Sequence, residues 1–339
     1  MTAPLRLDHY DRFPRGLCDI GPRDIRAIFP NPSLLTIAGR AGAPLFLSLL
    51  LHGNETTSFF VLQNLARAFE KELPPRPMLI FIGNVAGAEQ GLRVLSGGTD
   101  FNRIWAGGDT PEAALAAEVL KAARAAKPFA SIDIHNNTGA NPIYGCVNAL
   151  EARHLQLAAL FSRICVYYTN PKSTQSMAFT SICPSVTCEC GRPGEAEGIE
   201  RATRFVMDAL HLDHLDTASR AARDLSLYET KGRIVVDPDT DFEFGAGAAP
   251  LLFPVDLEKR NFSPLLAGAE IAHARTPENP LRVIDEEGRD LTGRFLTYEG
   301  GRIALARPAT PSMFTSSPSI IRQDCLGYLM EEIALPPSL

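Results

Sequence analysis

The sequence predicts an α/β protein with a central mixed, mainly parallel sheet flanked by helices and a smaller β-rich C-terminal domain. From about residue 34 to residue 214, short apolar runs alternate with amphipathic stretches, which is the pattern of strands and covering helices in one sheet. After about residue 224, short β-like runs are separated by turns rich in Asp, Gly and Pro. We therefore expect two domains, residues 1–225 and 226–339.

Composition sets the class of protein. The 339 residues are 45% hydrophobic and 21% charged, which is typical of a globular chain. The net charge of −6 and the absence of a basic cluster argue against a nucleic-acid partner or an anionic membrane surface. The N-terminal stretch lacks a signal-peptide pattern, and the seven cysteines show no C-x-x-C spacing. We therefore expect a cytoplasmic protein with free thiols.

The elements of the first domain follow from hydrophobic periodicity. Apolar residues recur three and four positions apart in the expected helices, and Pro111 stands where a first helical turn tolerates it. The expected strands are Leu34–Ile37, Leu45–Leu51, Met78–Ile82, Ala130–Ile134, Ile164–Tyr168 and Val186–Cys190. The expected helices are Thr56–Leu73, Pro111–Lys127, Ala149–Ile164 and Gly194–Leu210. In the second domain, Gly300 and Gly301 predict a two-residue hairpin connection.

Polar residues interrupt the chain where a buried strand ends. His52-Gly53-Asn54-Glu55 follows the apolar run from Leu45 to Leu51, at the position where open α/β sheets place their ligand crevice. Gly53 suits a sharp turn, and Thr56 or Thr57 suits the cap of the next helix.

Two further strand ends carry polar residues of the same kind. Asp133 and His135 end the run beginning at Ala130, and His52, Glu55 and His135 together form the ligand set of an open catalytic zinc site. Glu189 ends a third strand between Cys188 and Cys190, and strand alternation points it away from both thiols. A buried carboxylate at this position requires a cleft, a cation or a water molecule to act on.

Four motifs in this order resemble the succinylglutamate desuccinylase/aspartoacylase family of the zinc carboxypeptidase-like clan. They are H-G-N-E at residues 52–55, T-D-F-N-R at 99–103, D-I-H-N-N-T-G at 133–139 and C-E-C-G-R-P-G at 188–194. The resemblance covers roughly residues 45–195, and the β-rich C-terminal region agrees with it in kind.

The resemblance implies a zinc metallohydrolase that holds one Zn²⁺ per chain through His52, Glu55 and His135. Glu189 would then be the general base and acid acting on the metal-bound water. Asn102 and Arg103 would hold a substrate carboxylate, with two parallel hydrogen bonds from the guanidinium group. Arg93 would stabilise the carbonyl oxygen.

One departure from the family bears on the substrate. Aspartoacylases carry an Arg about ten residues before the catalytic Glu, and Phe179 stands at that position here, in a stretch from residue 173 to 189 without Arg or Lys. N-acetylaspartate and succinylglutamate are therefore not the expected substrates.

The expected reaction is hydrolysis of the amide of an N-acyl amino acid or a similar small carboxylate-bearing substrate. Asp133 is expected to support His135 from behind the metal centre. One alternative is a zinc carboxypeptidase or peptide amidase acting on short peptides with the same groups. An alternative of another class is a non-catalytic metal-binding module, against which the base Glu189 argues. Partners are expected to be small molecules, with a homo-oligomer possible.

Overall fold

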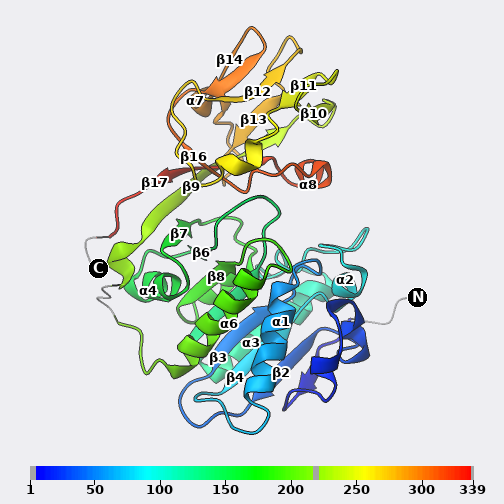
Figure 1. Ribbon diagram of the computed structural model, residues 1–339. Helices are drawn as coiled ribbons and strands as arrows, with labels where there is room; N and C mark the ends of the chain where they lie inside the picture. Colours follow the sequence, from blue (N-terminus) through cyan, green and yellow to red (C-terminus); the bar gives the residue numbers. More distant parts are fainter. Residues whose placement is uncertain (1–4, 217–220, 337–339) are drawn as a thin grey trace. The chain divides into compact units, whose positions relative to one another are not determined.

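The computed structural model describes residues 5–216 and 221–336, and its chain forms two compact units (Figure 1). The first unit contains the described residues of the ranges 1–136, 143–226 and 335–339, and the second contains 137–142 and 227–334. The N-terminal stretch, which lacks a signal-peptide pattern in the sequence, begins with residues 1–4, which lie outside the described residues. Among the residues that are described, none of the helices is long and apolar enough to cross a membrane.

The first unit is built on a mixed sheet whose strands lie in the order β1-β2-β4-β3-β5-β8-β6-β7. The strands β4, β3, β5 and β8 run parallel, whereas β2 pairs antiparallel with β4 and β6 pairs antiparallel with β8. Their bounds are Asp8–Tyr10 (β1), Ser33–Ile37 (β2), Leu45–Leu49 (β3), Met78–Ile82 (β4), Ala130–His135 (β5), Tyr144–Val147 (β6), Ile164–Tyr167 (β7) and Ser185–Glu189 (β8). The predicted fold class, a central mixed and mainly parallel sheet, is confirmed.

Helices cover both faces of this sheet. On one face Gly145 of β6 packs against Ala158 of α4, and Gly198 of α6 lies against the carbonyl of Cys190. On the other face the rings of Phe46 in β3 and Phe179 in α5 are 4.2 Å apart. The helices are Thr57–Ala68 (α1), Val85–Gln90 (α2), Pro111–Ala126 (α3), Ala152–Phe161 (α4), Gln175–Thr180 (α5) and Ala196–His211 (α6). Figure 1 shows α1 and α6 side by side over the sheet.

The carboxyl ends of β3, β5 and β8 meet at one edge of the sheet, because these neighbouring strands are parallel. The register pairs Ser48 with Asp133 and His135 with Glu189. Paired residues of adjacent strands point to the same face, and alternate residues of one strand do so too. The side chains predicted for the site are therefore brought to one edge and one face.

All predicted strands and helices of the first unit are present, with ends displaced by a few residues. The largest displacement is at α1, which ends at Ala68 rather than at Leu73. The sequence interpretation missed β1, β6, α2 and α5, which have three to six residues each. Segments this short contain at most two turns of helix or one alternation of a strand, so periodicity does not identify them.

The second unit is β-rich and has its own apolar core. Its antiparallel strands β13, β9, β17 and β16 are neighbours in that order, and a separate five-stranded sheet has the order β10-β11-β12-β15-β14. The bounds are Ser226–Val236 (β9), Phe242–Phe244 (β10), Leu251–Phe253 (β11), Glu270–Ala274 (β12), Leu281–Ile284 (β13), Leu296–Glu299 (β14), Arg302–Leu305 (β15), Thr310–Ser312 (β16) and Gly327–Glu332 (β17), with the short helices Thr292–Phe295 (α7) and Pro318–Gln323 (α8).

The hairpin between β14 and β15 has the predicted two-residue connection. Glu299 pairs with Arg302, and both residues between them have positive φ, 56° at Gly300 and 86° at Gly301. Two consecutive left-handed residues define the turn that matches the twist of a hairpin, and glycine adopts them without steric cost. The core of this unit includes Ile234, Phe253 and Phe295, all less than 2% exposed.

Candidate active site

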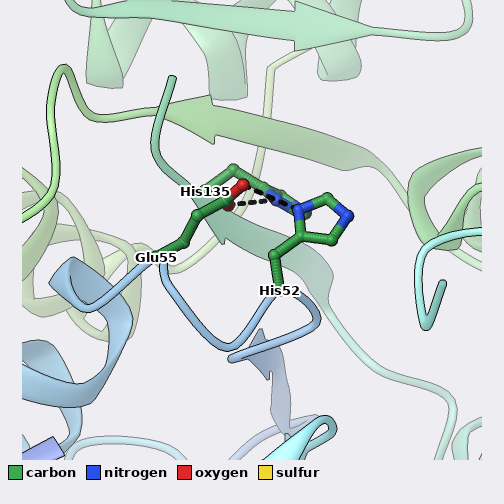
Figure 2. A group of neighbouring side chains, drawn as sticks. All are labelled: His52, Glu55 and His135. Carbon is green, nitrogen blue, oxygen red and sulfur yellow. Dashed lines mark hydrogen bonds and ion pairs between the residues drawn. The ribbon is translucent and has the colours of Figure 1, made fainter. Parts of the chain in front are cut away.

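The structure brings His52, Glu55 and His135 together at the carboxyl edge of the sheet. The Glu55 carboxylate lies between the two imidazoles, with Oε1 2.7 Å from Nδ1 of His52 and Oε2 2.8 Å from Nδ1 of His135 (Figure 2). One ligand atom from each residue can be chosen so that all three lie within 4.8 Å of one another. All three residues are at least 95% buried.

The turn after β3 positions the first two of these residues through a strained backbone. Leu50 adopts a left-handed conformation (φ 53°), which is costly for a residue with a branched side chain. Its amide donates to Oγ of Ser58 in α1 (3.0 Å), and its carbonyl accepts from Asn84 (2.7 Å). These two bonds hold the chain in a conformation that turns His52 back over the end of the strand.

Gly53 lies in a turn, as expected, but close packing is the reason that this position requires glycine. Its φ is not positive, and a Cβ atom there would lie 2.1 Å from the carbonyl carbon of Gly87 in α2. The H-G-N-E segment is thus pressed against the backbone of a second helix. Any larger side chain at this position would displace the turn that carries both His52 and Glu55.

A second carboxylate lies behind each imidazole. Nε2 of His52 is 3.0 Å from Oδ1 of Asp100, and Nε2 of His135 is 2.9 Å from Oδ2 of Asp133. A carboxylate acceptor fixes the proton on Nε2 and leaves the Nδ1 lone pair for a metal ion. Asp133 is itself held by the hydroxyl of Ser48 in the neighbouring strand β3.

The charges of these groups support one another. Burial alone would raise the pKa of Glu55, but the imidazoles of His52 and His135 hold it well below its ordinary value. Burial alone would lower the pKa of His135, but the carboxylates of Asp133 and Glu55 raise it well above its ordinary value. Asp100 is also partly desolvated, yet its hydrogen bond to His52 lowers its pKa. The carboxylates of Glu55 and Asp100 therefore stay ionised beside the imidazoles.

Glu189 lies beside this cluster and differs from it in its bonding. It ends β8 in register with His135 of β5, and it is 8% exposed. Burial raises its pKa to about 7, with His135 opposing the rise. Among the described residues, its Oε2 has no hydrogen-bond partner. A buried carboxylate that titrates near neutrality and keeps one oxygen unpaired has the properties of a general base.

Arg93, Asn102 and Arg103 lie in the loop that also carries Asp100. Arg93 contacts both Glu55 and Asp100 at 3.4 Å. The Asn102 amide nitrogen is 3.4 Å from Nε2 of His135, and its oxygen accepts the amide of Gln175 (3.0 Å). Arg103 is exposed and donates to the carbonyl of Asn102 (2.9 Å). The loop thus presents an amide and two guanidinium groups next to the cluster.

Sequence reasoning missed one residue that connects the site. Asn136 donates its backbone N–H to Oε2 of Glu55 (3.0 Å), and its side chain contacts α1 and the segment after β8. The expected capping of α1 by Thr56 or Thr57 is wrong, because Thr56 makes no side-chain cap bond and Oδ1 of Asn136 accepts the Thr57 amide (3.2 Å). The polar run after His135 was the available signal.

The residues present fit a divalent metal ion. Two imidazole nitrogens and one carboxylate oxygen form a ligand set typical of zinc, and three protein ligands leave a fourth position for water or substrate. Imidazoles whose other nitrogen is bonded to a carboxylate are also typical of such sites. The fold and this cluster define an α/β protein with a candidate metal centre at the carboxyl edge of its parallel strands.

Comparison with known proteins identifies the family. The profile of the succinylglutamate desuccinylase/aspartoacylase catalytic domain matches residues 41–211, which is half of the chain, and the chain belongs to this family of hydrolases. The matched range contains every residue of the cluster and of the loop described above. A comparison with curated protein sequences finds no match.

Solved structures of the same fold include three informative neighbours. A succinylglutamate desuccinylase/aspartoacylase from Rhodobacter sphaeroides has 17% identity and a TM-score of 0.61, with 88% of each chain covered. The succinylglutamate desuccinylase of Chromobacterium violaceum has 19% identity and a TM-score of 0.56, covering 87% of this chain and 86% of its own. Murine aminoacylase 3 has 18% identity and a TM-score of 0.54, covering 87% of this chain and 97% of its own. At these identities the similarity establishes the fold.

Proposed function

We propose that this protein is a zinc-dependent amidohydrolase that cleaves the amide of an N-acyl amino acid or a similar small substrate with a free carboxylate. One observation carries the proposal. Glu189, with a pKa near 7 and an unpaired oxygen, is in register with His135 of a cluster that can hold a metal ion. A metal-binding module without catalysis would not need a carboxyl group of this kind beside its ligands.

His52, Glu55 and His135 would hold one Zn²⁺ per chain. Bound zinc lowers the pKa of water and polarises a carbonyl group. Glu189 would receive a proton from the attacking water at its unpaired Oε2 and then donate it to the leaving amine. The raised pKa suits both steps, because the group can hold and release a proton near neutral pH.

The loop from Arg93 to Arg103 would bind the substrate. Arg103 is the exposed guanidinium group of the loop and can grip a carboxylate with two parallel bonds, assisted by the Asn102 amide. Arg93 is already held next to Glu55, where a developing negative charge on the carbonyl oxygen would be stabilised. The substrate would then carry its carboxylate on the amino-acid side of the scissile amide.

The acyl group would be uncharged. Phe179, which occupies the position where aspartoacylases carry an Arg, is fully buried in the apolar core and stacks against Phe46. The helix α5 that contains it, Gln175–Thr180, carries no cationic residue. A second carboxylate on the substrate would therefore find no partner from α5, and an acetyl or other neutral acyl group fits better.

We place the enzyme in the cytoplasm, since a reducing compartment suits its thiols. All seven cysteines are free, and six of them are buried. Burial raises the pKa of the Cys165 thiol above its ordinary value, so this thiol stays protonated in the core. Partners are small molecules, and self-association is compatible with this function.

The decisive experiment measures amine release from a panel of N-acyl amino acids by protein loaded with zinc. The panel pairs each N-acetyl amino acid with its C-terminal amide and with the corresponding N-succinyl compound. We expect hydrolysis of N-acetyl substrates with a free carboxylate, weaker hydrolysis of the other two classes, and close to one zinc ion per chain by metal analysis. Glu189→Gln should retain zinc and lose about 10²- to 10⁴-fold in turnover.

The control is Glu197→Gln, which changes an exposed carboxylate on α6. Faster cleavage of dipeptides than of N-acetyl amino acids would favour a carboxypeptidase or peptide amidase. Zinc binding without turnover of any compound would favour the non-catalytic module. Unchanged turnover in Glu189→Gln would remove Glu189 from the reaction.

A further inference from the structure

Asn136 connects the three segments that form the site. It follows His135 at the end of β5, and it is 6% exposed. Its side chain makes three hydrogen bonds: Oδ1 accepts from the Thr57 amide (3.2 Å), and Nδ2 donates to Oγ1 of Thr57 (2.9 Å) and to the carbonyl of Gly191 (2.9 Å). Its backbone N–H donates to Oε2 of Glu55 (3.0 Å).

Each partner of Asn136 stands next to a residue of the site. Thr57 is the first residue of α1, two positions after Glu55, and Gly191 is two positions after Glu189. One side chain therefore connects the turn after β3, the end of β5 and the end of β8. These three segments carry the candidate metal ligands and the candidate base.

Asparagine suits this position because its amide supplies one acceptor and two donors. Oδ1 serves a helix N-terminus that has no cap of its own, since Thr56 makes no side-chain cap bond. Both donor hydrogens of Nδ2 can be used at the same time, one for a hydroxyl oxygen and one for a carbonyl. Aspartate would lose the donors, and an aliphatic residue would lose all three bonds.

We propose that Asn136 is a positioning residue that fixes the distance and orientation of Glu189 relative to the metal ligands. It acts through Glu55, Thr57 and Gly191 and does not touch the substrate. The expected effect of Asn136 on turnover rests on the proposed hydrolase function. Its expected effect on the geometry of the metal ligands can be tested in the absence of any substrate.

The test compares Asn136→Ala with Asn137→Ala. Asn137 is the adjacent residue, also an asparagine and 4% exposed, but its Oδ1 accepts a hydrogen bond from Nδ2 of Asn141 (3.3 Å), within the second unit. We measure zinc affinity by competition with a chelator, the visible absorption of the cobalt-substituted protein, and kcat and KM for the best N-acyl substrate. Loss of a group that orients metal ligands typically costs 10- to 100-fold in metal affinity or activity.

For Asn136→Ala we expect a fall of about 10-fold or more in zinc affinity, a changed cobalt spectrum and a fall in kcat of about 100-fold with KM nearly unchanged. Asn137→Ala should match the wild type in all of these. A role limited to stability would lower the unfolding temperature of Asn136→Ala but leave its cobalt spectrum and its kcat per bound metal unchanged. That result would overturn the proposal.

A second pair of variants keeps the test decisive if Asn136→Ala does not fold. Thr57→Val removes the hydroxyl that accepts from Asn136, and Thr57→Ser keeps it. We expect Thr57→Val to lower kcat and zinc affinity in the same direction, and Thr57→Ser to restore them. Equal values in both variants would contradict the proposal. If the wild type binds zinc but hydrolyses nothing, the proposed function fails, while the affinity and spectral comparison still tests Asn136.

Discussion

The ends of β5 and β8 are adjacent, in register and buried to a similar degree, yet they bond in opposite ways. At the end of β5, both ring nitrogens of His135 and both carboxylate oxygens of Asp133 have partners. At the end of β8, Oε2 of Glu189 and Oγ1 of Thr187 have none among the described residues. The register pairs Asp133 with Thr187 and His135 with Glu189, so the contrast is residue by residue.

The difference separates two uses of a buried polar group. Side chains that must hold an ion in a fixed geometry gain from complete hydrogen bonding, which fixes their rotamers and protonation states. A side chain that must exchange a proton needs an oxygen free for the substrate or for water, and burial without bonding also raises its pKa toward neutrality. The first arrangement stabilises the fold, whereas the second is costly to it.

The comparison is tested most strongly by the stability of metal-free Glu189→Gln. The folded-state pKa of Glu189 is about 7, above its ordinary value of 4.5. The folded protein favours the protonated carboxyl group, so the stability that this group contributes is fully present below pH 4.5 and is lost as the pH rises through 7. Glutamine stays neutral, so at pH 8.5 the free energy of unfolding of the variant should exceed that of the wild type by up to about 3 kcal/mol.

The measurement is denaturant unfolding of both metal-free proteins from pH 4.5 to pH 8.5. The gain should shrink steadily as the pH falls and be small at the acid end. Glu197→Gln serves again as the exposed control. A gain that is independent of pH would show that the carboxyl group is not the source.

Asp133→Asn is expected to act on the bonded side of the comparison. The amide keeps the shape of the carboxylate but loses the negative charge that supports His135 and one of the two oxygens that accept from Ser48 and from Nε2 of His135. Zinc affinity should fall by about 10- to 100-fold. Chelator competition checks this value, and wild-type affinity in the variant would show that Asp133 does not orient the imidazole.

Thr187→Val is expected to have the smallest effect. The hydroxyl is buried and lacks a partner, so replacing it with a methyl group of similar shape should raise the free energy of unfolding by about 1 kcal/mol. Zinc affinity should stay unchanged, because Thr187 does not bond to any ligand. Denaturant unfolding of the two proteins measures the difference, and a loss of stability would mean that the hydroxyl has a partner in solution.

The sequence predicted the parallel strands and the ends at which His52, Glu55, His135 and Glu189 lie. Those predictions rest on long apolar runs interrupted by polar residues, a pattern that can be recognised without knowledge of tertiary contacts. The role of Asn136 did not follow from the sequence. Its partners lie 79 and 55 positions away in the chain, and no local pattern reports which distant backbone groups a side chain will meet.

The helix α5 shows a second limit. Its six residues were not recognised as a helix, so the side chain of Phe179 had no predicted direction. The apolar character of the residue is consistent with its burial, but only the structure shows that its ring stacks on Phe46 and packs near Trp105. Short elements are fixed by tertiary packing rather than by their own propensity.

The buried ring of Phe179 also limits how this scaffold could be redesigned. An arginine introduced there to recognise a dicarboxylic acyl group would place a guanidinium group in an apolar layer formed with Phe46 and Trp105, with no counter-ion supplied by α5. Under the proposed function, recognition of a dicarboxylic acyl group through this position would therefore require rebuilding the helix and its packing. In the proposed enzyme, selectivity for the acyl group thus depends on the packing of the core, and exchange of one side chain will not transfer it.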